Sequence, residues 1–259
     1  MDPETLKGKV AIITGAGRGL GRAIALSLAA KGTHVVLTAR TQSEIDAVAQ
    51  EISRLKVDAL AVKADVSRES EVEAVVQKTQ ARFKRIDILF NNAGIAGPTD
   101  FIAEIKTADW DRTIQVNLKG VFLFSRAVVP QMIRQRGGNI INISSGAGKR
   151  DRDISFLSPT RSLVYSVSKF GVEGFTLALA AQVNEFNINV NAIQPGATDT
   201  RIHAAASPER RAKMRRAEDI GSIAVFLASQ GPLGITGESL NVSAWEKIYL
   251  NREAAKAAL

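Results

Sequence analysis

The stretch KVAIITGAGRGLGRAI, from Lys9 to Ile24, decides the fold of this chain. Its residues 10–14 are apolar and rich in β-branched side chains, which predicts a strand buried on both faces of a parallel sheet. Residues 20–30 have the alanine-rich, amphipathic pattern of a helix. Four glycines lie at the junction: Gly15, Gly17, Gly19 and Gly21. A strand, a glycine turn and a helix N-terminus together form an anion site, for which a dinucleotide pyrophosphate is the usual ligand.

The spacing of these glycines is not the common fingerprint G-x-G-x-x-G, because the last glycine of that pattern would fall on Leu20. The chain has instead T-G-x-x-x-G-x-G, from Thr14 to Gly21. A tight turn that binds no ligand is the alternative interpretation. The position of the pattern directly after the first strand favours the nucleotide site.

Composition predicts one α/β domain. The chain has 259 residues, 45% of them hydrophobic, which is enough to bury a large core. It has no apolar run of membrane-spanning length, and its first residues, MDPETLKGK, lack the apolar stretch of a secretory signal. We therefore expect a cytoplasmic protein with no membrane partner. The absence of cysteine excludes disulfides and thiolate catalysis, and the two histidines, His34 and His203, lack ligand spacing, so we expect no metal site.

The net charge of +8 is compatible with a nucleic-acid partner. Aromatic residues make up only 5% of the chain, which argues against base stacking, so we expect no nucleic-acid binding. Two basic groups stand out: Arg210, Arg211, Lys213, Arg215 and Arg216, and Lys149, Arg150, Arg152 and Arg161. A solvated basic face and the attraction of an anionic substrate, carrier or cofactor both fit these groups.

Strand and helix patterns alternate along the chain. We expect strands at residues 10–14, 33–39, 59–63, 86–90, 139–143, 188–193 and 239–242. We expect helices at residues 20–30, 43–55, 67–83, 109–136, 165–186 and 219–228. This alternation predicts a doubly wound α/β fold, with a parallel sheet of about seven strands and helices on both faces. We expect a single domain over residues 1–259, with a cofactor half at about 8–95, a catalytic and substrate half at about 96–245 and a tail at 246–259.

The residue after the second strand indicates which cofactor is bound. An acidic residue there would accept hydrogen bonds from a free ribose 2′-hydroxyl, whereas an arginine favours a 2′-phosphate. This chain has Arg40, and Arg18 in the glycine turn adds a second positive charge. We therefore expect NADP rather than NAD, although either arginine also fits an ordinary surface position.

Tyr165 and Lys169 are four residues apart at the start of a predicted helix, which places their side chains on one face. An adjacent ammonium lowers the pKa of a tyrosine by favouring the phenolate, so this pair predicts an acid–base group. A half-buried tyrosine beside a solvated lysine is the alternative. The strand at 139–143 ends in Ser144 and Ser145, at the sheet edge where open α/β folds bind ligands.

Over nearly its whole length the chain resembles a short-chain dehydrogenase/reductase, because the motifs of that family occur in the family's order. The matching motifs are T-G-A-G-R-G-L-G at 14–21, D-V at 65–66, N-N-A-G at 91–94, V-N-L-K-G around Asn117, S-S-G-A-G from 144, Y-S-V-S-K at 165–169 and P-G at 195–196. The resemblance implies a Rossmann-like fold and hydride transfer between a nicotinamide and an alcohol or carbonyl carbon.

The resemblance also implies the catalytic roles. Tyr165 would exchange a proton with the substrate oxygen, and Ser145 would hydrogen-bond that oxygen. Lys169 would hold the nicotinamide ribose and lower the pKa of Tyr165, and Asn117 would position a water. Ser145 is preferred to Ser144 because it is the second serine of the family's S-S-x-x-G pattern.

In the same way the resemblance implies the cofactor contacts. Asp65 would hold the adenine, Val66 would line its pocket, and the N-N-A-G turn would support the sheet beside the cofactor. The expected cofactor-binding residues are Gly15, Arg18, Gly19, Leu20, Gly21, Arg40, Asp65, Val66, Asn92, Ala93, Gly94, Tyr165, Lys169, Pro195, Gly196, Thr198 and Thr200.

Three segments depart from the family pattern. The interval between Ser145 and Tyr165 is 19 residues, longer than usual, and we expect this insertion, with Arg150, Arg152, Phe156 and Leu157, to cover the substrate pocket; a plain surface loop is the alternative. The lid at residues 201–216 is small and basic. Near the C-terminus, residues 243–245 stand where the family often has a glycine pair. This puts the family's tetramer in doubt, whereas a dimer through the Asn117 and Tyr165 helices would remain. We therefore expect a homo-oligomer, either a homotetramer or a dimer.

The leading hypothesis is an NADP-dependent oxidoreductase for a small secondary alcohol or ketone, or for one carried on an anionic group. A 3-oxoacyl-thioester reductase that receives an acidic carrier protein is a narrower alternative. A regulator that senses NADP without turnover is a third, and the intact set of serine, tyrosine, lysine and asparagine argues against it.

Overall fold

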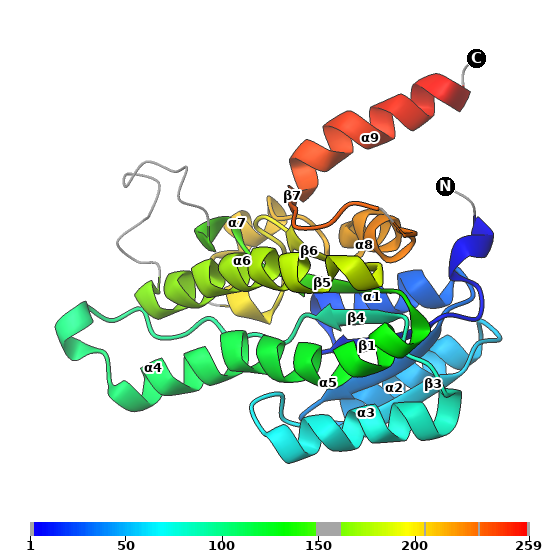
Figure 1. Ribbon diagram of the computed structural model, residues 1–259. Coiled ribbons are helices and arrows are strands. Elements are labelled where there is room, and N and C mark those ends of the chain that lie inside the picture. The colour runs from blue at the N-terminus through cyan, green and yellow to red at the C-terminus, as the bar shows by residue number, and fades with distance from the viewer. Residues whose placement is uncertain (1–2, 149–161, 205, 233, 258–259) are drawn as a thin grey trace.

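A seven-stranded parallel sheet forms the centre of the molecule, in the strand order β3-β2-β1-β4-β5-β6-β7 (Figure 1). The computed structural model describes residues 3–148, 162–204, 206–232 and 234–257. The strands are β1 (Val10–Thr14), β2 (His34–Ala39), β3 (Ala59–Lys63), β4 (Ile88–Asn91), β5 (Gly138–Ile143), β6 (Ile188–Gln194) and β7 (Ser239–Asn241). The predicted fold class is confirmed.

The direction of strand addition reverses between β1 and β4. Ile12 of β1 pairs with Val36 of β2 on one side and with Leu89 of β4 on the other. A crevice opens at the carboxyl ends of the strands at such a reversal, and ligands of open α/β sheets bind there. The glycine turn follows β1 and the N-N-A-G turn follows β4, so both lie at this point.

Two helical layers cover the sheet. The helices around it are α1 (Gly19–Ala29), α2 (Gln42–Ser53), α3 (Glu69–Phe83), α4 (Thr107–Ile114), α5 (Gly120–Gln135), α6 (Leu163–Val183), α7 (Pro208–Ala212) and α8 (Gly221–Ala228). Short 3₁₀ turns lie at Pro3–Leu6, Ile102–Glu104, Gly146–Gly148, Asn184–Phe186, Arg201–His203 and Ala217–Ile220. The faces of α1, α2 and α8 pack on one side of the sheet, and those of α3, α5 and α6 on the other.

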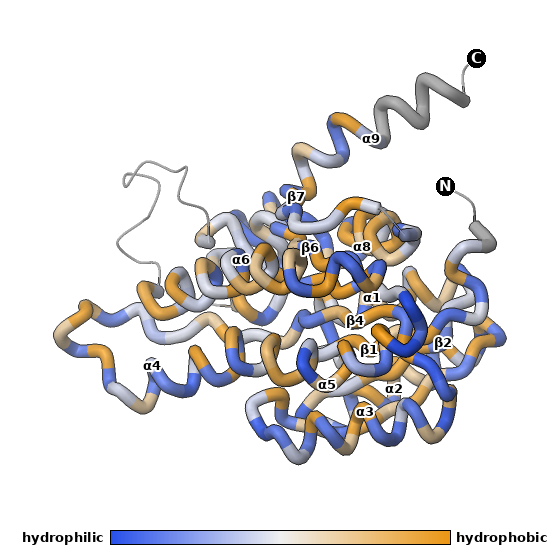
Figure 2. Tube along the Cα trace, in the orientation of Figure 1, coloured by the Kyte–Doolittle hydropathy of each residue, from blue (hydrophilic) through white to orange (hydrophobic). Residues whose placement is uncertain are grey.

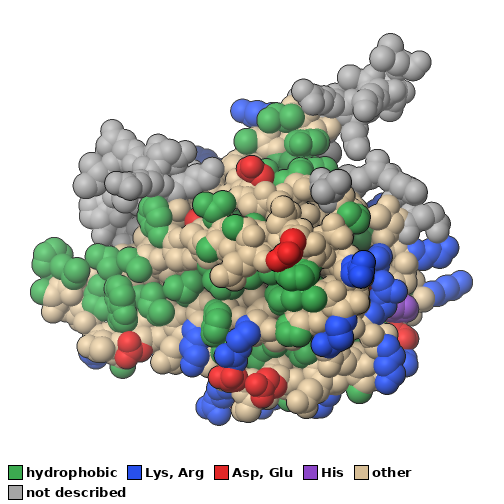
Figure 3. All heavy atoms as spheres, in the orientation of Figure 1, with side chains coloured by type: hydrophobic (Ala, Val, Ile, Leu, Met, Phe, Trp, Pro, Cys, Tyr) green, Lys and Arg blue, Asp and Glu red, His purple; other side chains and the backbone are tan. Residues whose placement is uncertain are grey.

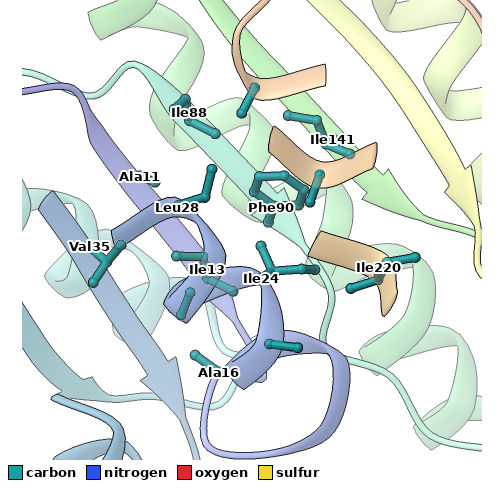
Figure 4. Close-up of a cluster of buried hydrophobic side chains, with 14 of the residues drawn as sticks. Ala11, Ile13, Ala16, Ile24, Leu28, Val35, Ile88, Phe90, Ile141 and Ile220 are labelled. Atoms are coloured by element: carbon teal, nitrogen blue, oxygen red, sulfur yellow. The ribbon is translucent and has the colours of Figure 1, made fainter. Parts of the chain in front are cut away.

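The burial of the strands explains their composition. All five residues of β1 are buried, as its apolar, β-branched-rich sequence predicts for a central parallel strand. All seven residues of β6 are buried as well, although three of them are polar, and the amides of Asn189, Asn191 and Gln194 are hydrogen-bonded within the protein. On one face, Ile13 and Phe90 pack against Ile24 and Leu28 of α1 (Figure 4). Figure 2 shows hydrophobic residues along β1 and β4 and a mixture of hydrophobic and polar residues along the helices.

Polar side chains tie the other face of the sheet to α6. Asn91 Nδ2 donates to Asn142 Oδ1 at 2.9 Å, and Asn142 Nδ2 donates to Thr176 Oγ1 at 2.9 Å. All three side chains are buried, so these bonds are shielded from water. The network fixes the position of α6, which carries Tyr165 and Lys169, on the sheet.

The helix predicted at 109–136 is present at Thr107–Gln135 but is not α-helical throughout. It contains a π-helical turn at Gln115–Lys119, between α4 and α5. Such wide turns frequently mark functional positions in helices, and this one contains Asn117.

The C-terminal segment forms helix α9 (Val242–Ala257), which begins directly after β7 and projects from the body of the molecule (Figure 1). Trp245 and Tyr249 pack against Phe226 of α8, with ring centroids 5.4 and 5.0 Å away. The predicted last strand therefore ends at Asn241 rather than at residue 242.

Hydrophobic side chains gather on the surface around α4 and α6 (Figure 3). The exposed apolar residues of this area are Phe101, Ile102, Trp110, Leu163, Val167, Phe170 and Leu177. No helix within the described ranges is both long and apolar enough to cross a membrane.

Candidate active site

The glycine turn brings the backbone of β1 against the start of α1. Gly15 has φ +63°, a conformation that disfavours side chains with a Cβ. A Cβ at Gly21 would lie 2.2 Å from the carbonyl oxygen of Gly15, so only glycine fits there. Arg18 occupies the N-cap of α1 and makes no side-chain cap hydrogen bond, which leaves amides of the described first turn for an anion. The side chain of Leu20 packs on the core.

The N-N-A-G turn is hydrogen-bonded to the glycine turn. Thr14 Oγ1 accepts from the amides of Asn92 and Ala93 at 2.9 and 3.0 Å. Asn92 Nδ2 donates to the carbonyls of Thr14 and Gly15 at 2.8 and 3.2 Å. The two loops therefore form one rigid unit at the point where strand order reverses.

Arg40 and Asp65 follow the adjacent strands β2 and β3. Partial burial raises the pKa of Asp65, but hydrogen bonds from Ser67 and the charges of Arg40 and Arg68 outweigh it, and the net pKa is lowered. Arg40 is exposed and makes no ion pair within the described chain. Val66, the next residue after Asp65, is buried. Arg40 and Asp65 lie close enough for their charges to interact, at the carboxyl ends of the paired strands β2 and β3.

Tyr165 and Lys169 lie one turn apart on α6. Ser162 caps this helix by accepting a hydrogen bond from the Tyr165 amide at 3.1 Å. Lys169 Nζ lies 5.6 Å from the centroid of the Tyr165 ring and donates to the Ile143 carbonyl at 2.6 Å. Lys169 is therefore held by the carboxyl end of β5, beside a half-buried tyrosine.

Lys169 is a buried cation, with only 4% of the residue exposed. Burial lowers the pKa of Lys169 to about 8, and the charge of Glu173 acts in the opposite direction. The ammonium is therefore present at neutral pH and is lost as the pH rises through about 8.

Asn117 joins the loop after β4 to α6. Its Oδ1 accepts from the Ile95 amide at 2.8 Å, and its Nδ2 donates to the Ile95 carbonyl at 2.9 Å and to Ser168 Oγ at 3.0 Å. The side chain is fully buried and its amide is occupied by protein groups. A Cβ at Gly94 would lie 3.4 Å from Asn117 Oδ1 and 3.9 Å from Lys169 Nζ, so the N-N-A-G turn reaches the catalytic candidates.

Ser144 and Ser145 differ in environment. Ser145 is half-buried, and its Oγ accepts from the Ala147 amide at 3.2 Å. Ser144 is buried, and its hydroxyl has no partner among the described residues. The turn that follows lies against α6, since a Cβ at Gly148 would be 2.7 Å from the Lys169 carbonyl oxygen. The accessible hydroxyl beside Lys169 is thus that of Ser145.

The segment after β6 returns to the glycine turn. Gly196 has φ +78°, which turns the chain after the buried Pro195. Thr200 Cγ2 lies 3.4 Å from where a Cβ of Gly19 would be. Thr198 is 2% exposed, and its Oγ1 has no partner in the part of the chain that the structure describes. A cavity of about 360 Å³ lies beside this segment, lined in part by Pro195, Gly196 and Lys213.

The basic group of the lid is mostly paired with local carboxylates. Arg211 pairs with Asp199 at 2.7 Å, Arg215 with Glu246 at 2.6 Å and Arg216 with Asp219 at 3.1 Å. Pairing reduces the positive charge available to a partner. The second basic group and the insertion residues Arg150, Arg152, Phe156 and Leu157 lie outside the described residues.

Sequence reasoning missed several residues that shape this site. Thr14 joins the two turns, Ser162 caps α6 and Glu173 lies one turn beyond Lys169. The position of Ser162 just before a helical pattern and the four-residue spacing from Lys169 to Glu173 are signals that could have identified two of them. No sequence pattern indicates the pairing of Thr14 with the distant Asn92.

Known proteins of several kinds are similar to this chain. A family model described as short chain dehydrogenase matches residues 9–211. A 3-oxoacyl-[acyl-carrier-protein] reductase of Synechocystis sp. is 38% identical over 245 residues, which cover 92% of this chain and 96% of that protein. The crystal structure of a 3-ketoacyl-ACP reductase from Sinorhizobium meliloti has a TM-score of 0.80 at 34% identity, over 90% of this chain and 96% of that one. The crystal structure of an NAD+-bound xylitol dehydrogenase has a TM-score of 0.81 at 27% identity, over 91% and 98%.

Proposed function

Since the chain belongs to the short-chain dehydrogenase family of NAD(P)-dependent oxidoreductases, we propose that it interconverts a secondary alcohol and a ketone, with NADP as cofactor and Tyr165 as the acid–base group. The observation that carries this proposal is the position of Tyr165 beside the buried Lys169 ammonium, at the carboxyl end of β5. A buried cation next to a phenol has a clear use in proton transfer and none in packing.

The described residues fit a dinucleotide. The uncapped first turn of α1 and the glycine turn would hold the pyrophosphate, and Arg40 would face the 2′-phosphate. The unpartnered hydroxyl of Thr198 and the position of Thr200 over Gly19 fit the nicotinamide half. When bound, the nicotinamide supplies or accepts the hydride.

Proton transfer falls to Tyr165. In the direction of ketone reduction, its hydroxyl donates a proton to the oxygen on which negative charge develops, and in the reverse direction its phenolate takes that proton. The Lys169 ammonium favours the phenolate form by its charge. The Ile143 carbonyl, 2.6 Å from Nζ, keeps the ammonium in place.

Ser145 and Asn117 have supporting roles. The half-buried hydroxyl of Ser145 would donate to the substrate oxygen and stabilise its developing charge. Both amide hydrogens of Asn117 are donated to Ile95 and Ser168, so a water positioned by this residue would not bind to the side-chain nitrogen. The side chain itself holds the loop after β4 against α6.

Reduction of a 3-oxoacyl thioester is the second candidate. It is favoured by the 38% identity to the Synechocystis reductase over nearly the whole of both chains. Local pairing of Arg211, Arg215 and Arg216 leaves Arg201, Arg210 and Lys213 as the lid cations without an ion pair within the described ranges, which weakens the case for a carrier docking on the lid. The exposed apolar surface around α4 and α6 supports a homo-oligomer in which these helices form the contact between subunits.

Turnover of a carbonyl panel with NADPH tests the proposal. The panel pairs an acetoacetyl thioester with simple ketones, and Tyr165→Phe is measured in parallel. We expect the variant to bind NADPH normally and to lose roughly 10²- to 10⁴-fold in kcat, because it lacks the proton donor. A variant that keeps more than a tenth of the activity would remove Tyr165 from the mechanism. NADPH binding without any turnover by the wild type would favour the sensor function.

A further inference from the structure

An ion pair joins the glycine turn to helix α2. Arg18 Nη1 hydrogen-bonds Glu44 Oε1, and both side chains are partly exposed, 48% and 32% respectively. Glu44 lies directly against the turn, since a Cβ at Gly17 would be 2.7 Å from Glu44 Cβ. The carboxylate is therefore fixed beside the predicted pyrophosphate and ribose positions.

The charges around this point differ in their pairing. Arg40, at the end of β2, makes no ion pair within the described chain. Arg22, one turn further along α1, pairs with Glu51 of α2 at 2.5 Å. Of the two arginines expected to favour a 2′-phosphate, Arg40 is available and Arg18 is neutralised by Glu44.

We propose that Glu44 is a specificity-determining residue that competes with the 2′-phosphate of NADP for Arg18 and so limits the preference for NADP over NAD. This inference rests on the proposed use of NADP. A 2′-phosphate that approaches Arg18 must share the guanidinium with Glu44 or displace it, and it meets the repulsion of the carboxylate. A free 2′-hydroxyl carries no charge and avoids most of this penalty.

The size of the effect follows from the exposure of the pair. Partly exposed ion pairs contribute 0 to about 1 kcal/mol, so their removal changes an equilibrium by up to about fivefold. We expect Glu44→Gln to lower the Kd for NADPH by about two- to fivefold and to change the Kd for NADH by less. The gain shrinks at high salt, because the charges involved are partly exposed.

Equilibrium titration of the full chain with NADPH and NADH, followed by nicotinamide fluorescence, tests this inference without turnover. Glu51→Gln is the matched control, because it removes the carboxylate of the neighbouring Arg22 pair on the same two helices. It is expected to leave the ratio of the two Kd values unchanged. In an Arg18→Ala background, Glu44→Gln should lose most of its effect on that ratio, because the competition requires Arg18.

The outcomes separate this inference from the proposed function. If the wild type prefers NADPH and Glu44→Gln leaves the ratio of the Kd values for NADPH and NADH unchanged, the role of Glu44 is overturned and the proposed function stands. Weaker NADPH binding in the variant also overturns it, since Glu44 would then orient Arg18 for the phosphate. A wild type that binds neither nucleotide overturns the proposed function and this inference together.

Discussion

The glycine turn and the Lys169 pocket lie next to each other at the carboxyl edge of the sheet, yet they are stabilised differently. The glycine turn is held by short hydrogen bonds between Thr14, Asn92 and main-chain groups, with no buried charge among them. The Lys169 pocket contains a buried ammonium and, at Ser144, a buried hydroxyl without a described partner. The polar groups of the glycine turn therefore stabilise the fold, whereas the buried polar groups around Lys169 destabilise it.

The free-energy cost of burying the Lys169 ammonium follows from its pKa. The pKa of Lys169 falls from 10.5 to about 8, which corresponds to about 3 kcal/mol of destabilisation of the charged form. One such term is a sizeable part of the stability of a domain. A buried cation that costs stability is the pattern expected of a functional site, which supports the role proposed for Lys169.

Lys169→Met has the largest expected effect and tests this comparison directly. We expect at least a hundredfold loss of activity, because Tyr165 loses its neighbouring charge. We also expect the variant to be more stable than the wild type at pH 7, by about 1 kcal/mol, since relief of the buried charge exceeds the lost hydrogen bond to Ile143. Chemical denaturation at several pH values measures the second effect.

The lowered pKa of Lys169 determines how the stability difference between the wild type and Lys169→Met changes with pH. Between about 8 and 10.5 the unfolded chain keeps the Lys169 proton that the folded chain has lost, so this group makes wild-type stability rise with pH in that window. Below about 8 the buried ammonium destabilises the fold by its full amount. The advantage of the variant should therefore shrink above pH 8, and an advantage that is constant with pH would contradict a buried ammonium.

Gly21→Ala probes the other region. The added methyl group would lie 2.2 Å from the Gly15 carbonyl oxygen, so β1 and α1 must separate. We expect about 1–3 kcal/mol of destabilisation and a weakened nucleotide site. Gly174→Ala in α6 is the matched control: no atom lies within 4 Å of the new Cβ, and we expect it to stabilise the fold by about 0.5–1 kcal/mol. Equal effects of the two variants would show that the turn is not closely packed.

The sequence predicted the sheet well because buried parallel strands have nearly continuous apolar runs, as in β1 and β2. It also placed Tyr165 and Lys169 correctly on one helical face, since that spacing is local. It did not predict α9, whose first turns are fixed by packing of Trp245 on Phe226. It did not predict the pairing of Arg18 with Glu44 or of Arg215 with Glu246, because such partners are chosen by tertiary structure.

The smallest expected effect concerns Glu173, one turn beyond Lys169. Glu173 Oε1 accepts from Gln194 Nε2 at 3.0 Å and from Ser239 Oγ at 2.9 Å, which fixes the carboxylate on α6. Its charge opposes the effect of burial on Lys169, so Glu173→Gln should lower the pKa of Lys169 below about 8. We expect this to be the smallest of the effects considered, because burial and not the charge of Glu173 is the larger influence on the pKa of Lys169.

The measurement is the stability difference between Glu173→Gln and the same chain carrying Lys169→Met. That difference should begin to shrink at a lower pH than it does between the wild type and Lys169→Met. Glu173→Asp keeps the charge and should retain the wild-type profile. If Glu173→Gln left the profile in place, the carboxylate would act only by holding β6 and β7 on α6.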